Sequence, residues 1–485
     1  MSALKTFFKD TIIYGIAAVL PRVINFLLLP VHTDALPANE YAQNTDFYIW
    51  AGLCAVLLTF GMETAFFRFY NKVEKKDALI STAFFSMLIG VAAFLTILIV
   101  FFDSFLPIFD FENNPIRLKL FIGIMALDTL AMIPFAFLRA SHKPIKYALI
   151  KLINVGVILV INLLFLKFIP EFIAQGKSLP TLINNNYTVI PIIEYIFVAN
   201  LLGSTVSFLF LIPYLLRFKF QFDFVLLKQL LAYSWPIAVA GLAYVINENL
   251  DKFLIKRMIG DTEMGVYAAC YKLAIFMNLY IMAFRLGAEP FFFNNADKKN
   301  AKSTYSKIMN YFVIIGSFVF VGIVVYIDVL KELFIHNNEY WGAIKIVPVV
   351  LLAYLFLGIY YNLSIWYKLT DKTRYGMYFS IVGAIITIVL NVWLLNSIGI
   401  MAAAWATLIA YSSMAFISYI VGKKHYPVSY NLKKMAIYLI VSIIICAISF
   451  LKFRGNLIVS TVFVILFGVI IYLNERKELR LIIKK

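Results

Sequence analysis

Long apolar runs alternate with short polar segments along the whole chain. Each run holds close to the 20 residues that a helix needs to cross the hydrocarbon core of a bilayer, and the segments between the runs are rich in charged residues, Pro, Gly and Asn. The pattern predicts fourteen transmembrane helices. Their ranges are 11–32, 43–67, 78–102, 117–139, 146–168, 189–216, 228–255, 263–289, 305–328, 343–368, 375–396, 399–421, 432–451 and 456–474. Since no loop is long enough to hold a soluble domain, the chemistry must take place among the helices.

The composition supports this interpretation. Of the 485 residues, 62% are apolar and 14% are charged, against about 25% charged residues in soluble globular domains. A chain this poor in polar residues cannot cover the surface of a soluble protein, and it is too apolar to be disordered. The three cysteines, Cys54, Cys270 and Cys446, lie inside apolar runs, so no disulfide framework is expected. The predicted fold class is an all-α polytopic membrane protein.

The net charge of +17 and its distribution predict how the chain is oriented in the membrane. Basic residues concentrate in cytoplasmic loops of membrane proteins. With a cytoplasmic N-terminus, the predicted inside segments carry 28 Lys and Arg residues and the outside segments carry 9. The nine are Arg117, Lys119, Lys167, Lys177, Lys256, Arg257, Lys331, Lys452 and Arg454. This asymmetry predicts that both termini are cytoplasmic, and it explains the positive charge without nucleic-acid binding.

The first apolar run contains Arg22 and lacks a small-residue cleavage site. These features favour a first transmembrane helix over a removed signal peptide.

Two parts of the chain resemble each other. The matches are Val23–Asn25 with Val245–Asn247 at an offset of 222, and Gly61 and Glu63 with Gly287 and Glu289 at an offset of 226. They predict two six-helix lobes related by a parallel repeat, residues 1–222 and 223–422, followed by residues 423–485 with two further helices and a basic cytoplasmic tail. Two such lobes around a cleft are the architecture of alternating-access transporters.

Ionisable residues deep in a membrane are costly and usually serve a function. Four lie far enough from the ends of the predicted spans to be informative: Arg22, Asp128, Glu248 and Lys272. Arg22 follows Pro21, which removes one backbone hydrogen bond and is expected to bend the helix. A guanidinium beside such a bend can bind an oxyanion through paired hydrogen bonds. The alternative is a structural ion pair between Arg22 and Asp128.

The seventh predicted span carries a second polar cluster. Glu248 and Lys252 stand four residues apart in the order that favours a helical ion pair. In that case the two charges at this helix end neutralise each other and have only a structural role. The functional interpretation is a polar wall, in which Lys252 helps to bind an anion and Glu248 or Asp251 carries a coupling ion. Lys272 has no carboxylate three or four residues away. The candidate anion-binding residues are therefore Arg22, Lys252 and Lys272, and the candidate coupling-ion residues are Asp128, Glu248 and Asp251.

A further group of charged residues lies near the expected cytoplasmic ends of the spans and provides candidates for a gate. The group consists of Glu63, Arg68, Arg139, Arg285 and Glu289. No HExxH, GxxxxGK[ST] or paired-cysteine pattern occurs in the sequence, so neither a metal nor another cofactor is expected.

Several segments resemble one family. The segment Leu53–Tyr70, the sequence Tyr233-Ser234-Trp235-Pro236 and the segment Asn247–Lys272 are similar to the polysaccharide (O-antigen, Wzx-type) flippases of the multidrug/oligosaccharidyl-lipid/polysaccharide exporter superfamily. The resemblance covers about residues 1–422. It implies a flippase of the bacterial cytoplasmic (inner) membrane that moves an undecaprenyl-diphosphate-linked oligosaccharide to the outer leaflet. It also implies a cationic cavity and coupling to H⁺ or Na⁺, with no enzymatic activity. Against this pattern, the deep basic residues are few and Asp128 partly offsets them.

Other classes of protein remain open at this stage. A drug or cation/proton antiporter of the same superfamily would need an acidic cavity. A membrane enzyme of the same polysaccharide pathway would need a histidine in mid-membrane or a long external loop, and the sequence shows neither. A scaffold or receptor would leave the deep charges in both halves unexplained.

Overall fold

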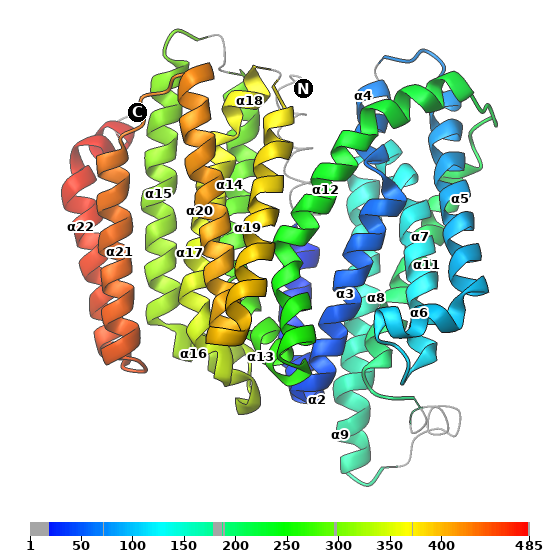
Figure 1. Cartoon of the computed structure of the whole chain (residues 1–485), viewed down its shortest axis with the longest axis horizontal. Coiled ribbons are helices and arrows are strands. Elements are labelled where there is room, and N and C mark those ends of the chain that lie inside the picture. The colour runs from blue at the N-terminus through cyan, green and yellow to red at the C-terminus, as the bar shows by residue number, and fades with distance from the viewer. Residues whose placement is uncertain are drawn as a thin grey trace. The chain divides into compact units, whose positions relative to one another are not determined.

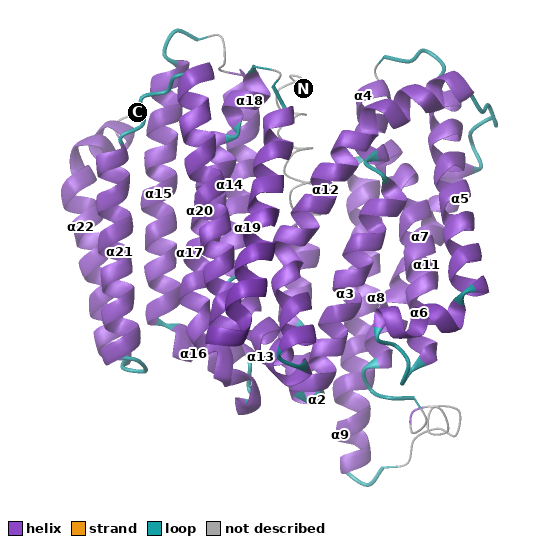
Figure 2. Ribbon diagram, in the orientation of Figure 1, coloured by secondary structure: helices purple, strands orange, loops and turns teal. Residues whose placement is uncertain are grey.

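The structure is a computed structural model that describes residues 19–70, 72–177, 187, 190–294, 298–370 and 372–483. Within these ranges the chain is helical apart from short loops and turns, and no strand occurs (Figure 2). The chain divides into two compact units, Met1–Asn249 and Leu250–Lys485. The division falls inside one long helix, α12 (Phe224–Met258). The lobe boundaries expected at residues 222 and 422 remain predictions.

In the first unit, long helices run side by side (Figure 1). Residues 19–27 are helical, whereas the bend expected at Pro21 involves residues before 19, which lie outside the described part of the chain. The helices that follow are α2 (Leu29–Ala35), α3 (Ala38–Thr59), α4 (Met62–Tyr70), α5 (Lys76–Val100), α6 (Phe102–Phe109), α7 (Pro115–Ala140), α8 (Pro144–Leu163), the π-helical turn η1 (Leu164–Phe168), α9 (Ile169–Ala174) and α11 (Glu194–Leu215).

The second unit begins within α12 and has the same character (Figure 1). Its helices are α13 (Asp261–Lys272), α14 (Ile275–Asn294), α15 (Ala301–Val325), α16 (Ile327–Phe334), the 3₁₀ helix η2 (Asn338–Ile346), α17 (Val347–Leu363), α18 (Ile365–Leu369), α19 (Arg374–Ile398), α20 (Ile400–His425), α21 (Leu432–Lys452) and α22 (Leu457–Ile483).

Twelve helical segments of the described chain are long and apolar enough to cross a membrane, and the bent pair α13–α14 raises the number to 13 if it forms one span. Each of them overlaps one of the ranges predicted from 43–67 onwards. The remaining range, 11–32, begins among residues that the structure does not describe. The helical membrane fold is confirmed, and the count of fourteen stays a prediction.

The second predicted span is broken into α3 and α4. Phe60 and Gly61, between these helices, have φ angles of 47° and 70°, a left-handed conformation that glycine adopts easily and phenylalanine rarely. A Cβ atom on Gly61 would lie 2.8 Å from the backbone oxygen of Ser234 and 3.0 Å from Cβ of Ile237 on α12. A glycine is needed here because both the backbone conformation and the close approach of α12 exclude a larger residue.

A buried ion pair joins α7 to α11. Nε and Nη2 of Arg117 donate to Oε1 of Glu194 at 2.9 and 2.6 Å, and Nη1 of Arg117 donates to Oε1 of Gln43 at 2.9 Å. The two charged side chains are 2% and 0% exposed. The guanidinium also lies 5.6 and 5.5 Å from the ring centroids of Phe111 and Phe197. A charge this far from water depends on its partner.

Polar contacts also tie down the two last helices. Glu475 on α22 accepts hydrogen bonds from Nζ of Lys434 at 2.7 Å and from the hydroxyl of Tyr438 at 2.8 Å, both on α21. In the turn before α22, Arg454 pairs with Asp328 at 3.0 Å, and Lys331 pairs with the same carboxylate at 2.6 Å. The pair α21–α22 is therefore fastened at both of its ends.

Candidate functional site

A polar cavity of about 570 Å³ lies within the first unit, among α3, α4, α7, α8 and α11. Its wall contains four charged side chains, two acidic and two basic, together with amide, hydroxyl and aromatic groups. The lining residues that carry the following argument are Glu63, Asp128, Phe135, Arg139, Tyr147, Lys151, Asn154, Asn200, Ser204 and Ser207. Because the helices that form it are membrane-spanning candidates, the cavity is a polar space inside an apolar part of the protein.

Asp128 and Lys151 face this cavity from α7 and α8. Ser204 donates a hydrogen bond of 2.6 Å to Oδ1 of Asp128. Nζ of Lys151 lies 4.3 Å from the ring centroid of Phe135. Among the contacts of the described residues, no ion pair joins Asp128 to Lys151. The cavity therefore presents a carboxylate and an ammonium that do not neutralise each other by direct contact.

Glu63 and Arg139 form the second charged group of the wall. Nη1 of Arg139 donates to Oε1 of Glu63 at 2.8 Å, and each side chain is 42% exposed. The break at Phe60–Gly61 starts a new helix, α4, just before Glu63 and so sets the direction of its side chain. Arg139 also lies over the ring of Phe67, 4.7 Å from its centroid. Two of the five gate candidates thus meet, although 76 residues separate them in the sequence.

Other residues of the wall were not singled out from the sequence: Lys151, Asn154, Asn200 and Ser204. Lys151, Asn154 and Ile158 follow one another at spacings of three and four and all line the cavity, so the periodicity of the predicted span 146–168 was a usable signal for this face. Helices α8 and α11 approach closely here, because a Cβ atom on Gly203 would lie 2.9 Å from Ile158 and 3.2 Å from Asn154.

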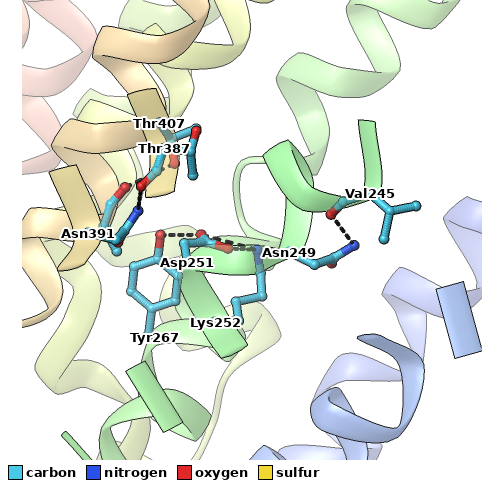
Figure 3. A network of polar contacts seen from close by, with 9 residues as sticks. Val245, Asn249, Asp251, Lys252, Tyr267, Thr387, Asn391 and Thr407 are labelled. Carbon is cyan, nitrogen blue, oxygen red and sulfur yellow. Dashed lines mark hydrogen bonds and ion pairs between the residues drawn. The ribbon is translucent and has the colours of Figure 1, made fainter. Parts of the chain in front are cut away.

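A second polar cluster lies in the second unit around Asp251 and Lys252 of α12. Nζ of Lys252 lies 3.1 and 3.3 Å from the two carboxylate oxygens of Asp251, and the hydroxyl of Tyr267 donates to Oδ2 at 2.7 Å (Figure 3). Nζ of Lys252 is also 3.7 Å from the ring centroid of Tyr271. Asp251 and Lys252 are 1% and 7% exposed. One candidate coupling-ion residue and one candidate anion ligand thus contact each other directly.

Lys272 is the last residue of α13, where the chain bends by 44° before α14. It is half-buried, as is Glu248 of α12. Arg22 is exposed in the helical stretch 19–27, and it is not among the described residues that line the cavity with Asp128.

Arg68 and Arg285, two further gate candidates, each lie over an aromatic ring. Arg68 is 4.5 Å from the ring centroid of Tyr233, and Arg285 is 4.1 Å from that of Tyr361. Glu289 belongs to α14, but its side chain falls outside the described part of the structure.

Over the described residues, no group of three or more His, Cys, Asp or Glu side chains is arranged to hold a metal ion. The charged groups found here are suited to binding, proton transfer or gating.

Comparison with known proteins gives the family. Residues 7–295 match the family model described as "Polysaccharide biosynthesis protein", and residues 236–393 match the model "MatE". The chain belongs to the polysaccharide biosynthesis protein family. The relative "Lsg locus putative protein 1" of Haemophilus influenzae (strain ATCC 51907 / DSM 11121 / KW20 / Rd) is 20% identical over 302 residues, which are 60% of this chain and 67% of that protein.

Solved structures share the fold. "Lipid II flippase MurJ, inward closed conformation" aligns with a TM-score of 0.72 at 16% identity, over 96% of this chain and 99% of that chain. An inward-facing multidrug resistance MATE transporter of the MOP superfamily aligns with a TM-score of 0.63 at 12% identity, over 88% and 99% of the two chains. A MOP superfamily transporter from Pyrococcus furiosus, whose title reports a binding pocket of reverse polarity, aligns with a TM-score of 0.58 at 13% identity, over 87% and 95%.

The family and the shared fold agree with the membrane-spanning helices. The chain is a multi-pass membrane protein of the polysaccharide biosynthesis protein family, and the solved structures that share its fold bear the names of flippases and transporters. The resemblance noted in the sequence is confirmed at this level.

Proposed function

We propose that the protein flips an undecaprenyl-diphosphate-linked oligosaccharide from the cytoplasmic to the outer leaflet of the bacterial cytoplasmic membrane, by ion-coupled alternating access. The observation that carries the proposal is the match of residues 7–295 to the polysaccharide biosynthesis protein family. The polar cavity among candidate membrane-spanning helices supports the proposal, because a polar head group that crosses the membrane needs a polar environment inside the protein. The lipid tail of such a substrate can remain in the bilayer throughout.

In this proposal Arg22, Lys252 and Lys272 bind the diphosphate. Arg22 is exposed, and its guanidinium can donate paired hydrogen bonds to phosphate oxygens. Lys272 stands at a bend in its helix, where the C-terminal end of α13 also favours a positive charge. Lys252 is paired with Asp251, so this ion pair must break before the ammonium of Lys252 can bind the diphosphate.

The coupling ion, H⁺ or Na⁺, is proposed to act at Asp128, Glu248 or Asp251. Of the three, Asp128 lines a cavity and accepts a hydrogen bond from Ser204 at Oδ1, so its other carboxylate oxygen can bind a cation or a proton. Asp251 is deeply buried and contacts Lys252 and Tyr267. Binding of a cation there competes with the ammonium of Lys252.

The gate is proposed to lie at the Glu63–Arg139 pair, with Arg68, Arg285 and Glu289 as further members. A pair of side chains that are each 42% exposed contributes at most about 1 kcal/mol. Such a contact can open and close within the time of a transport cycle.

The function is tested by deleting the gene and restoring it on a plasmid. We expect the deletion strain to lose surface polysaccharide and to accumulate lipid-linked oligosaccharide in the inner leaflet, and the plasmid to reverse both effects. Normal surface polysaccharide in the deletion strain, with no other flippase gene present, contradicts the proposal.

A drug or cation/proton antiporter is the second candidate. It is favoured by the MatE match over residues 236–393 and by the fold shared with MATE transporters. This candidate predicts that the deletion strain becomes sensitive to cationic dyes and keeps its polysaccharide, the opposite outcome of the same experiment.

The anion site is tested at Arg22. Arg22→Lys keeps the positive charge but cannot reproduce the planar paired hydrogen bonds, so we expect a large loss of polysaccharide export, and Arg22→Ala should lose nearly all of it. Lys272→Ala should lower export as well. If Arg22 instead forms a structural pair with Asp128, Arg22→Ala misfolds and the additional removal of Asp128 restores folding and export. Normal export by a well-expressed Arg22→Ala protein refutes the anion site.

Coupling is tested by neutralising the three carboxylates one at a time, as Asp128→Asn, Glu248→Gln and Asp251→Asn. We expect at least one variant to reach the membrane in normal amounts and to lose transport. Full transport by all three variants would indicate uncoupled flipping.

A further inference from the structure

We propose that the cavity of the first unit binds a neutral sugar ring of the substrate and excludes the diphosphate. The inference rests on the proposed flippase function and assigns the two parts of the substrate head group to different places. It concerns the wall formed by α7, α8 and α11, in particular Asp128, Lys151, Asn154 and Ser207.

The charge of the wall argues against an anion. The basic residues Arg139 and Lys151 are balanced by the acidic residues Glu63 and Asp128, so the wall carries no net charge. Arg139 is already paired with Glu63 at 2.8 Å. A diphosphate drawn to Lys151 would also face the carboxylate of Asp128, and like charges in a confined space of low dielectric constant repel strongly. A neutral ligand avoids this cost.

The hydrogen-bonding groups of the wall suit a polyhydroxylated ligand. The hydroxyl of Ser207, in a residue that is 3% exposed, has no hydrogen-bond partner among the described residues. The side-chain amide of Asn154 likewise makes no hydrogen bond within the described part of the protein. Ser207 is buried and Asn154 is half-buried, so a missing hydrogen bond is costly above all at Ser207; sugar hydroxyls, which both donate and accept, would satisfy both side chains. Asp128 can accept from a hydroxyl and Lys151 can donate to one.

Aromatic side chains complete the site. Phe135 and Tyr147 both line the cavity, and their rings pack edge to face with centroids 5.4 Å apart. The C–H face of a pyranose is apolar and can pack against such rings, while its hydroxyls reach the polar groups. The volume of about 570 Å³ falls within the range of about 300–1,000 Å³ that is usual for small-ligand sites.

The experiment measures binding to the purified protein in lipid nanodiscs. The probes are undecaprenyl diphosphate without a sugar and the same lipid carrying one glucose, galactose, N-acetylglucosamine or N-acetylgalactosamine. We expect the protein to bind at least one sugar-bearing lipid about tenfold more tightly than the bare lipid. A tenfold change corresponds to about 1.4 kcal/mol, close to the net contribution of one hydrogen bond.

Two substitutions remove the sugar contacts, Lys151→Met and Asn154→Leu. Each should abolish the tenfold preference and leave the affinity for bare undecaprenyl diphosphate unchanged. Methionine is an unbranched apolar side chain of similar length to lysine, so Lys151→Met remains informative if Asn154→Leu fails to fold. Lys146→Met is the matched control, because Lys146 lies on the same helix but contacts Tyr214 and does not line the cavity.

Four results overturn the inference. In the first, the protein binds bare and sugar-bearing lipids equally, so the cavity holds no sugar. In the second, Lys151→Met lowers the affinity for both kinds of lipid to the same extent, which makes the cavity an anion site. In the third, the preference for the sugar-bearing lipid survives in both variants, which places the sugar elsewhere. These three leave the flippase proposal standing. If none of the lipids binds, the flippase proposal fails together with the inference.

Discussion

Removal of Arg117 tests how much the buried ion pair contributes to the first unit. In the variant Arg117→Met the carboxylate of Glu194, which is 0% exposed, loses both of the hydrogen bonds that it accepts from the guanidinium. Gln43 loses its bond to Nη1 as well. Methionine fills most of the space with an apolar chain, so the main effect is a buried carboxylate left without its counter-charge.

Breaking one partner of a buried pair costs about 3–5 kcal/mol. In a unit of this size each kcal/mol shifts the melting temperature by about 2–4 °C, so we expect a fall of about 6–20 °C in the apparent melting temperature. The double variant Arg117→Met/Glu194→Leu removes the stranded charge and should recover more than half of this loss, because apolar replacements of a whole buried pair are often neutral.

The assay is thermal unfolding of the purified protein in one detergent, followed at a fixed heating rate because membrane proteins often unfold irreversibly. Lys119→Met is the control, since Lys119 lies two residues further along the same helix and is exposed; it should change the stability by less than about 0.5 kcal/mol. If Arg117→Met unfolds within about 2 °C of the unaltered protein, the ion pair does not carry the stability assigned to it here.

Three further predictions concern other parts of the chain. Gly61→Ala, which brings Cβ to 2.8 Å from the oxygen of Ser234 at a φ of 70°, should lower the apparent melting temperature, whereas Gly90→Ala in the open interior of α5 should raise it or leave it unchanged. Burial raises the pKa of Asp328, but hydrogen bonds and charge from Arg454 and Lys331 outweigh this and hold the pKa below its usual value. The carboxylate therefore stabilises the fold above the unfolded pKa of about 4, and this stabilisation is lost as the pH falls through the folded pKa. Below pH 5, the stability of Asp328→Asn should fall less steeply with decreasing pH than that of the unaltered protein. Reporter fusions after residues 75, 143, 299 and 424 should read cytoplasmic and those after 36, 110, 178 and 337 external; two inverted results would contradict the orientation.

Much of the fold follows from the sequence because hydrophobicity alone decides where a membrane helix runs. The predicted range 117–139 corresponds to α7, Pro115–Ala140, and the range 375–396 to α19, Arg374–Ile398. Interruptions are less visible in such a pattern. The break between α3 and α4 lies inside the apolar range 43–67, and Gly61 at this break is in close contact with α12, which comes from a distant part of the chain.

The cavity could be predicted only in part. Glu63, Asp128 and Arg139 are identifiable because charges within apolar runs are rare, yet their partners depend on which helices pack together. The sequence offers Arg22 as an alternative ion-pair partner of Asp128, whereas the hydrogen bond that the structure shows at Asp128 comes from Ser204, whose hydroxyl is inconspicuous in a sequence. Arg117 is counted from the sequence as a loop charge because it begins a predicted span, whereas folding places α11 over it and buries it.

The charged wall of the cavity also has an evolutionary consequence. Glu63 and Arg139 touch each other across two helices, so a change at one position alone leaves an uncompensated charge. Among related proteins the two positions should therefore covary, either as exchanged charges or as a joint loss of both. Asp128 and Lys151 are not bound by such a contact. No pairwise covariation of this kind is therefore expected between these two positions.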